Sequence, residues 1–383
     1  MIGAGQILQI LGLREIRDAT AFLENGEVAV GFDLYLPSAR LLTDDDRARV
    51  ATNLARVFRV ALPVGGRARL YVEAVEGRLD LPTSYLQKLE RSQGPVKEAN
   101  QARLDVIRMR AAEGKVRQWY YSLLVYWTPA FPKKANQSYT PEEYASVLTE
   151  VQQVRNSVQS LLEEVGVQVE PMDDGALAEM VFRYFNPSLL GQKPRARKPG
   201  EHVLEPLVLS TVHNNQEQII RVGNTYLTHV VFHRGPRYTH PGVMDIIQSI
   251  TGEFILVLEV THPDQMGTSA RINLNRTRLE NMAADLGNRA DPELVAKAQA
   301  LARGLTRRAQ TGEHIMTSAI QIILRNRELS LLHAQASEAY AKAQTLPDAV
   351  VVKTPPDAFD YWIAASPFHT ELLPRRWSFL DLN

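Results

Sequence analysis

The sequence predicts a mixed α/β protein of the α+β kind, built from two similar modules in which helices pack on a mixed or antiparallel sheet. Three observations support this prediction. Segments of alternating apolar residues, typical of strands, follow one another along the chain with helical segments between them. The apolar and charged contents, 45% and 22%, are those of a globular protein. The length of 383 residues suits two domains, each large enough to bury a core.

The first half contains four strand signals and four helix signals. Thr140 with Pro141 behind it is a typical helix start, and so is Thr43, where three consecutive Asp residues place negative charge on the first turn. We interpret these Asp residues as a cap rather than a metal site, because adjacent carboxylates diverge around a helix axis. We expect strands at 27–36, 68–75, 116–127 and 167–170, and helices at 43–62, 82–114 (interrupted near Gly94 and Pro95), 141–165 and 173–185.

A stretch rich in Gly, Pro and basic residues separates the halves, between Pro187 and Pro206. Such composition is typical of a linker. We therefore divide the chain into a first module at 1–190, a basic linker at 191–206 and a second module at 207–383. A solvated loop is the common meaning of such a run, but the linker is also our candidate contact for nucleic acid, another anion or anionic lipid. Its basic residues are Lys193, Arg195, Arg197 and Lys198.

The second half repeats the order of the first, which indicates an internal duplication. The segments VQVEPMDDGAL (167–177) and VVVKTPPDAFD (350–360) both predict a short strand that turns at Pro into a helix capped by Asp. Two ferredoxin-like modules with long helical arms fit this order, although α/β chains also alternate in this way by chance. We expect strands at 218–222, 225–233, 253–261, 315–325 and 349–353, and helices at 242–250, from about 262 to 312 (broken near Gly287), 328–344 and 357–364.

Composition narrows the possible functions. Lys plus Arg equals Asp plus Glu, at 43 each, so no overall field attracts a polyanion. The absence of Cys excludes disulfides and thiolate sites and gives no sign of an oxidising compartment. The apolar N-terminus lacks the features of a signal peptide, and the apolar runs fall well short of the roughly 18 residues that cross a bilayer. We expect a cytoplasmic protein whose membrane contact, if any, is peripheral.

No catalytic motif is found. The sequence has no GxxxxGK[ST] loop, GxGxxG, HExxH, GxSxG or EF-hand loop, and the single Gly-Lys pair, Gly114 and Lys115, lacks the upstream glycine. We accordingly assign no catalytic, cofactor-binding or metal-ligating residue. An enzyme without local motifs stays open.

Two groups of residues are further candidate sites. His229 and His233 would share one face of a strand, but a metal needs three or four converging ligands, which favours ordinary surface or strand-edge histidines. The aromatic strand Trp119–Trp127 could stack nucleic-acid bases if exposed. Its interleaved Leu and Val residues favour a central, buried strand instead.

As a whole the chain resembles the N-terminal region of the assembly ATPases of type IV secretion and conjugative transfer systems, the VirB-four or TraC-like family. The resemblance is spread over nearly the whole chain and every motif in it is degenerate. Its segments are REIRDATAFLENGEVAVGFDL (14–34), the helix of 44–62, YVE (71–73), YYSLLVYW (120–127), MVFRYFNP (180–187), Pro241–Gly242, EFILVLEVTHPD (253–264) with the helical arm after it, and RRWSFLDLN (375–383).

The resemblance implies a domain that associates with like subunits and docks the motor on the inner-membrane secretion complex, at the cytoplasmic face of that membrane. In the family a RecA-like motor with Walker motifs follows this region, whereas this sequence ends at Asn383. ATP and magnesium are implied for that motor, and no cofactor for this chain. We expect the natural reading frame to continue past Asn383 into such a motor domain. The alternatives are a stand-alone scaffold or nucleic-acid-binding protein that uses the linker, and an enzyme built around the histidines.

Overall fold

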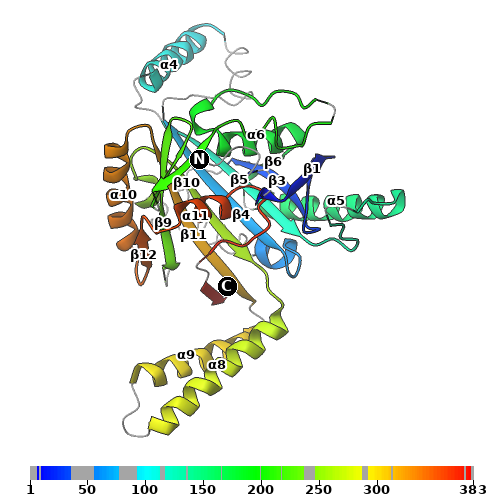
Figure 1. Ribbon diagram of the computed structural model, residues 1–383, viewed down its shortest axis with the longest axis vertical. Helices are drawn as coiled ribbons and strands as arrows, with labels where there is room; N and C mark the ends of the chain where they lie inside the picture. The colour runs from blue at the N-terminus through cyan, green and yellow to red at the C-terminus, as the bar shows by residue number, and fades with distance from the viewer. Residues whose placement is uncertain are drawn as a thin grey trace.

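The computed structural model describes residues 7, 10–35, 56–76, 93–112, 117–134, 137–164, 166–198, 200–216, 218–236, 246–286, 292–311, 314–374 and 377–380. The fold is mixed α/β, with helices around one open sheet (Figure 1). The predicted helix starts at Thr43 and Gly242, the helix of 82–92 and the Pro241–Gly242 turn lie outside the described residues. Of the first of these helices, the described end is a π-helical turn, Val57–Ala61.

All strand pairs of this sheet are antiparallel within the described residues, and neighbours follow the order β1-β2-β3-β5-β4-β10-β11-β9-β8-β7. Three further strands add to its flanks: β6 to β3, β12 to β9 and β13 to β11. The strands are β1 Leu13–Arg17, β2 Thr20–Leu23, β3 Val28–Tyr35, β4 Arg67–Glu76, β5 Arg117–Trp127, β6 Gln168–Pro171, β7 Val212–Gln216, β8 Ile219–Val222, β9 Thr225–Arg234, β10 Glu253–Thr261, β11 Ile315–Asn326, β12 Val350–Lys353 and β13 Trp377–Leu380.

The two halves of the chain have the same topology. The first half has the strand order β6-β3-β5-β4 and the second has β12-β9-β11-β10, and each begins with a short strand pair, β1–β2 or β7–β8. The halves meet at β4 and β10, which pair antiparallel. An approximate twofold axis therefore passes between these two strands. Within the described residues the strand order of the two halves repeats, whereas the predicted helices at 43–62 and 242–250 lie partly outside them and the domain limits at 190 and 206 stay a prediction.

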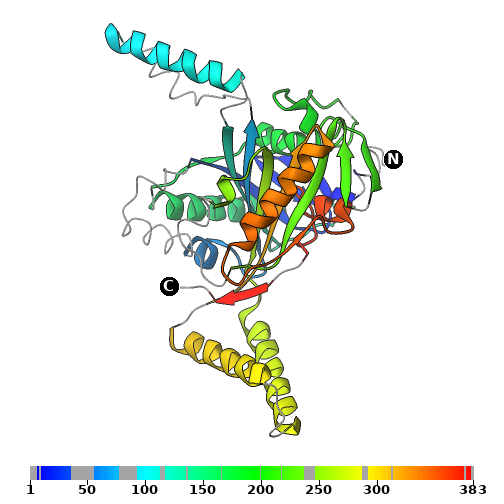
Figure 2. The ribbon, with the colours of Figure 1, turned by 90° about the vertical axis from the view of Figure 1, so that its left-hand side faces the viewer.

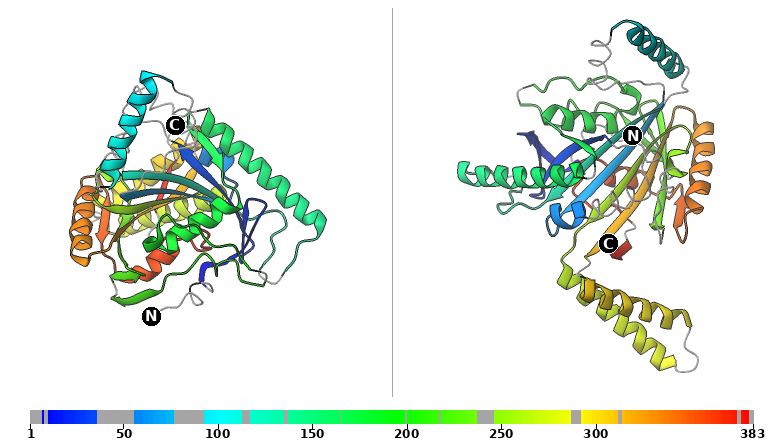
Figure 3. Two further views of the ribbon diagram at one scale, coloured as in Figure 1. Left: turned by 90° about the horizontal axis from the view of Figure 1, so that it is seen from above. Right: turned by 180° about the vertical axis from the view of Figure 1, so that it is seen from behind.

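Helices of the described residues cover both faces of the sheet (Figures 1 and 3). They are α5 Pro141–Glu163, α6 Asp174–Phe185, α10 Leu329–Gln344 and α11 Ala358–Ala364. The predicted start of α5 is correct: Thr140 Oγ1 accepts a hydrogen bond from Glu143 N, and the Glu143 carboxylate accepts one from Thr140 N, which forms a capping box.

The predicted Asp caps of the paired helices α6 and α11 differ. Asp173 Oδ1 accepts a hydrogen bond from Ala176 N at 2.8 Å and caps α6 as expected. The prediction for α11 is wrong. Asp357 stands at its N-terminus with φ +63° and makes no capping hydrogen bond, because that left-handed backbone turns its side chain away from the first free N–H groups.

Side chains along each strand point alternately to the two faces of the sheet, so each face has its own apolar core. On one face a single apolar cluster extends under both α6 and α11, where Tyr184 stacks on Trp362 with ring centroids 5.8 Å apart. On the other face two clusters lie apart, one under α5 and one under α10. The face under α6 and α11 therefore joins the two halves.

Two helical arms leave the body at opposite ends (Figures 1 and 2). The first is α4, Pro95–Ala112, between β4 and β5; the second is the hairpin of α8, Gln265–Leu286, and α9, Pro292–Thr311, between β10 and β11. Because β4 and β10 are antiparallel, their following segments emerge at opposite ends of the sheet. The predicted break near Gly287 lies outside the described residues.

Candidate functional site

Charged residues occupy the junction of the two halves. Along β4, Arg67, Arg69, Tyr71 and Glu73 alternate with apolar residues and lie on the face that carries α6 and α11. Arg69 stands opposite Glu259 of β10, and its Nε donates to Glu259 Oε2 at 2.7 Å. Both side chains are fully buried. We call this face of β4 and β10 the seam.

The electrostatics of the seam keep the Arg69 guanidinium charged. Burial alone would lower the pKa of Arg69, but the adjacent Glu259 carboxylate outweighs it and the net shift is upward. The pKa of Arg67 is lowered, because burial and the positive charge of Arg69 together outweigh the attraction of the nearby negative charges. Glu27 contributes the opposing charge, since its Oε2 accepts from Arg67 Nη2 at 2.9 Å.

A segment near the end of the chain crosses the seam and is held by these guanidinium groups. We call residues 366–374 strap 2. Arg67 donates to the carbonyls of His369, Thr370 and Glu371 at 2.7, 3.1 and 2.8 Å. Arg69 donates to the carbonyl of Ser366 at 2.9 Å, and Glu259 Oε1 accepts from Leu373 N at 2.9 Å. Strap 2 therefore ties the second half of the chain to β4 and β10.

The first half has an equivalent segment, which crosses onto the second half. We call residues 186–211, other than 199, strap 1. Asn186 is fully buried; its Nδ2 donates to the carbonyls of Phe182 and Leu207, and its Oδ1 accepts from Leu209 N and Ser210 N, all at 2.7–2.9 Å. Val203, Leu204, Leu207 and Val208 of strap 1 belong to the same core cluster as residues of strands β7 to β9.

Each strap also packs closely against a glycine from the other half of the chain. A Cβ on Gly223, after β8, would lie 2.9 Å from Ser188 Oγ of strap 1. A Cβ on Gly12, before β1, would lie 2.8 Å from Thr370 Cγ2 of strap 2. Both glycines have positive φ, so the close approach and the backbone both favour Gly. The two halves thus exchange straps reciprocally.

A second group of charges lies further along the seam. Arg325 Nη2 approaches Glu73 Oε1 at 2.8 Å and Arg183 Nε approaches Glu73 Oε2 at 3.7 Å. A cavity of about 20 Å³ adjoins them, lined in part by Glu73, Arg183, Tyr120 and Ser122. That volume suits one water molecule rather than a substrate. Burial raises the pKa of the nearby Asp33, which accepts a hydrogen bond from Ser122 Oγ.

Two open clefts are larger. One of about 300 Å³ carries carboxylates and guanidinium groups together, with Glu76, Glu253 and Glu328 beside Arg325 and Arg327. Another of about 360 Å³ lies between β1 and the start of α5. The mixed charges of the first cleft favour no single class of ligand.

Within the described residues, no three His, Asp or Glu side chains are placed to hold a metal ion.

The predicted basic residues of the linker are all exposed, but they do not form one free cluster. Arg195 binds Glu201 through both terminal nitrogens, at 2.7 and 3.0 Å, and Glu201 also accepts from Lys198 N. These bonds lower the pKa of Glu201 to about 2. Lys193, Arg197 and Lys198 have exposed side chains and no ion pair within the described part of the chain. Arg195 is the one whose charge is balanced.

The histidines weighed as metal ligands do not converge. His229 is fully buried and its Nδ1 lies 2.7 Å from Gln321 Nε2; burial lowers its pKa to about 3. His233 is partly exposed on the same strand. A different pair meets at the base of the second arm, where His262 Nε2 lies 2.9 Å from His314 Nδ1. Sequence spacing could not reveal this pair, because the whole arm separates the two residues.

The aromatic strand has the buried position that was predicted for it. β5 lies between β3 and β4, and its residues from Ser122 to Trp127 are buried. Trp119, Tyr120 and Tyr121 are half-buried, and Trp119 packs against Phe254 of β10 at 5.7 Å. The strand is part of the core and not a base-stacking platform.

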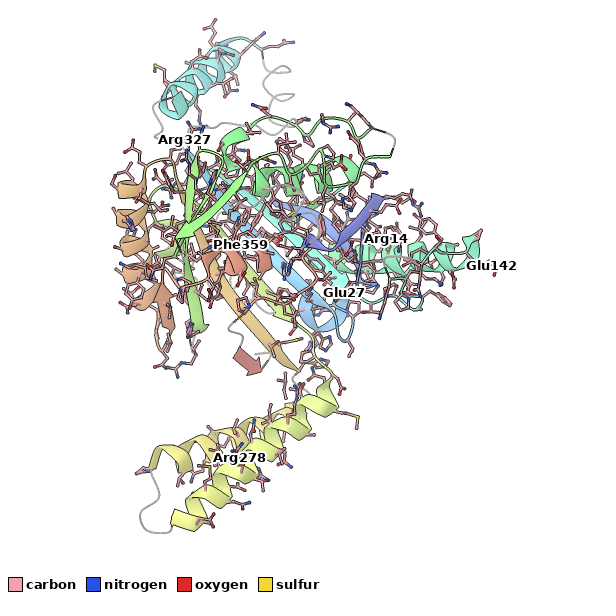
Figure 4. All side chains as sticks on the ribbon, viewed as in Figure 1. Arg14, Glu27, Glu142, Arg278, Arg327 and Phe359 are labelled. Carbon is pink, nitrogen blue, oxygen red and sulfur yellow. The ribbon has the colours of Figure 1, made fainter. Side chains whose placement is uncertain are left out.

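The second arm is fixed at its base and exposed along its length. Gln265 Nε2 donates to the Ile315 carbonyl and its Oε1 accepts from Ile315 N, at 2.9 and 2.8 Å. Thr268 on α8 and Ala298 on α9 are buried. The outer residues are exposed, including Arg278, which projects far from the body (Figure 4).

Sequence reasoning did not identify the seam residues or the pairing of His262 with His314. For the seam a signal is present, since Arg, Arg and Glu recur at alternate positions of an otherwise apolar strand.

No helix of the described residues is long and apolar enough to cross a membrane. Neither a family model nor a curated protein matches the chain.

Proposed function

We propose that the chain is the non-catalytic assembly and docking part of a type IV secretion, or conjugative transfer, ATPase. Its partners would be further copies of itself and the inner-membrane components of the secretion complex, at the cytoplasmic face of that membrane with peripheral membrane contact at most. ATP and magnesium would belong to the motor. The dispersed segments that resemble this family, from REIRDATAFLENGEVAVGFDL to RRWSFLDLN, motivate the proposal.

One structural observation supports a docking role above all others: two arms project from opposite ends of a body whose halves are tied together by exchanged straps. Arms on a rigid body keep fixed relative positions, which suits a part that holds other proteins in place. We also propose that each half is a ferredoxin-like module, since each has a strand order of fourth, first, third, second.

A donor-cell experiment tests this function. The tagged chain is overproduced in cells that use the conjugation system encoding it, where it should compete with the full ATPase for docking sites and lower transfer frequency by about tenfold or more. A variant in which a short Gly-Ser turn replaces 265–311 should compete less, and the variant Asp285→Asn is the matched control. The tagged chain should also co-purify with inner-membrane proteins of that system. Unchanged transfer together with failure to co-purify would contradict the proposal.

The alternative, a stand-alone scaffold or nucleic-acid-binding protein that uses the linker, predicts a different result. Exposed Lys193, Arg197 and Lys198 are the observation that favours it. Replacing these three residues with Ala would then abolish nucleic-acid binding by the purified chain. Under the proposed function the same variant keeps its effect on transfer.

A further inference from the structure

We infer that the second arm, the α8–α9 hairpin, is a binding element for the phosphate backbone of nucleic acid. This inference is independent of the proposed function, because it rests on the distribution of charge and on the exposure of the arm.

Charge is segregated between the arm and the rest of the chain. Residues 265–311 contain eight Lys and Arg but four Asp and Glu, a net charge of +4. The other residues contain 35 basic and 39 acidic side chains, a net charge of −4. The neutral total therefore conceals a basic arm on an acidic body. Such a field guides polyanions to the arm and away from the body.

The cations on the arm are accessible. Arg271, Arg278 and Arg303 are exposed, and none of them forms an ion pair within the described residues. Among the described residues, the hydrogen bond of the Arg271 side chain is to Thr268 Oγ1 and that of Arg303 is to the Gln299 carbonyl, both at 3.4 Å. Of the acidic residues, Glu280 is already 3.5 Å from Arg276.

The arm geometry suits a long, charged ligand. A helix of 22 residues is about 33 Å long, at roughly 1.5 Å per residue. Arg271 and Arg278 are seven residues apart and therefore lie on one face of α8, about 10 Å apart along the axis. The views of Figures 1 and 2 agree that the arm stands clear of the sheet. A nucleic acid can approach this face without meeting the acidic body.

A lipid surface fits the arm less well. An interfacial helix needs a continuous apolar face opposite its basic face. The exposed apolar residues of α8, Met266, Leu274 and Met282, are eight residues apart, so each step turns about 80° around the helix and they form no stripe. On α9, Leu301 and Leu305 are half-buried. Backbone phosphates need only the cations.

Binding of fluorescently labelled 30-mer duplex and single-stranded DNA to the full chain tests the inference. Fluorescence anisotropy across a salt series should give a Kd of about 10⁻⁶ to 10⁻⁴ M near physiological salt, falling steeply at lower salt. Because each phosphate contact contributes about 0.9 to the logarithmic salt slope on duplex, the triple variant Arg271→Ala, Arg278→Ala, Arg303→Ala should lose about 2–3 from that slope. Its affinity should fall about tenfold or more.

The matched control removes the same amount of charge elsewhere, as Lys193→Ala, Arg197→Ala, Lys198→Ala. It should keep the affinity within about twofold, and both variants should unfold like the parent because all six side chains are exposed. Equal loss in the two variants, or no loss in the arm variant, would overturn the inference. So would absence of DNA binding at low salt, or arm-dependent binding to phosphatidylserine-containing vesicles without binding to DNA.

Discussion

The two straps make the same connection with different chemistry. Strap 1 is fixed by the neutral amide of Asn186, which bonds only to backbone groups. Strap 2 is fixed by the charges of Arg67, Arg69 and Glu259, which bind backbone groups and one another. The same topology is therefore compatible with either a neutral amide or a set of charged side chains at this position.

The difference changes how each strap should respond to perturbation. An amide has no charge, so its loss costs hydrogen bonds alone. A buried guanidinium cannot be removed without leaving a carboxylate that has lost its counter-charge. We therefore expect strap 2 to be the more sensitive of the two to substitution and to pH.

The largest effect is expected for Arg69→Met. The substitution leaves Glu259, fully buried, without its cation and removes the donors to the Ser366 and Glu371 carbonyls. It should lower the free energy of unfolding by about 3–5 kcal/mol. Denaturant unfolding followed by circular dichroism measures the change.

Two further variants make this result specific. Arg69→Met combined with Glu259→Leu should recover part of the loss, because the unpaired carboxylate is gone. Arg278→Met, on the exposed arm, should change stability by less than about 0.5 kcal/mol. A cost below about 1 kcal/mol for Arg69→Met would mean that the seam charges do not hold the halves together.

Much of the fold follows from local sequence. β5 and α5 have regular periodicity and clear end signals, such as Thr140 and Pro141, and both were predicted within two residues at each end. The turn between β1 and β2 could not be predicted in this way. Asp18 and Ala19 both have positive φ, which Ala seldom adopts, and the turn is held by Asp174 and Arg155 from far along the chain.

The seam was also hard to predict, because it too depends on contacts between residues that are far apart in the sequence. The pattern of Arg67, Arg69 and Glu73 along β4 is visible, but its meaning depends on the partners. Glu259 is 190 residues from Arg69 and Ser366 is 297 residues from it. Local pattern gives the faces of a strand, whereas pairing between distant segments decides whether a charge on the inner face is balanced. The linker residues show the converse, since Glu201 is close in sequence and was overlooked as the partner of Arg195.

The next effect is a pH dependence that strap 2 contributes. Burial, with the charges of Arg69 and Arg67, lowers the pKa of His369 from 6.5 to about 4. Between these values the unfolded chain binds a proton that the folded protein does not, so stability is complete above pH 6.5 and falls as the pH is lowered toward 4. The loss from this residue should reach about 3 kcal/mol.

His369→Asn isolates this contribution, since a side-chain oxygen can replace Nδ1 as the acceptor for Glu371 N. Unfolding free energies of the variant and the parent at pH 7, 6, 5 and 4 should diverge, with the flatter profile in the variant. Some slope persists in both, because burial also lowers the pKa of His229. Parallel profiles for parent and variant would show that strap 2 is not the source of the pH dependence.

The smallest of these effects is expected in strap 1. Asn186→Ala removes four hydrogen bonds and leaves the buried carbonyl of Leu207, the buried amide of Ser210 and the partly buried amide of Leu209 without this partner, which should cost about 2 kcal/mol. No charge is left behind, so the cost should not vary with pH between 7 and 5. Hydrogen exchange at the amides of Leu209 and Ser210 should accelerate by more than the global loss of stability explains.

Ser366→Ala in strap 2 is the matched control for that variant, because Ser366 is also fully buried after its helix but its hydroxyl makes only one bond, to the Ile363 carbonyl at 2.7 Å. Its cost should be about 1 kcal/mol or less. Two results would contradict the comparison of the straps. One is an Asn186→Ala cost as large as that of Arg69→Met; the other is retained protection at Leu209 and Ser210. Either would mean that apolar packing of strap 1, and not its amide, fixes the first half to the second.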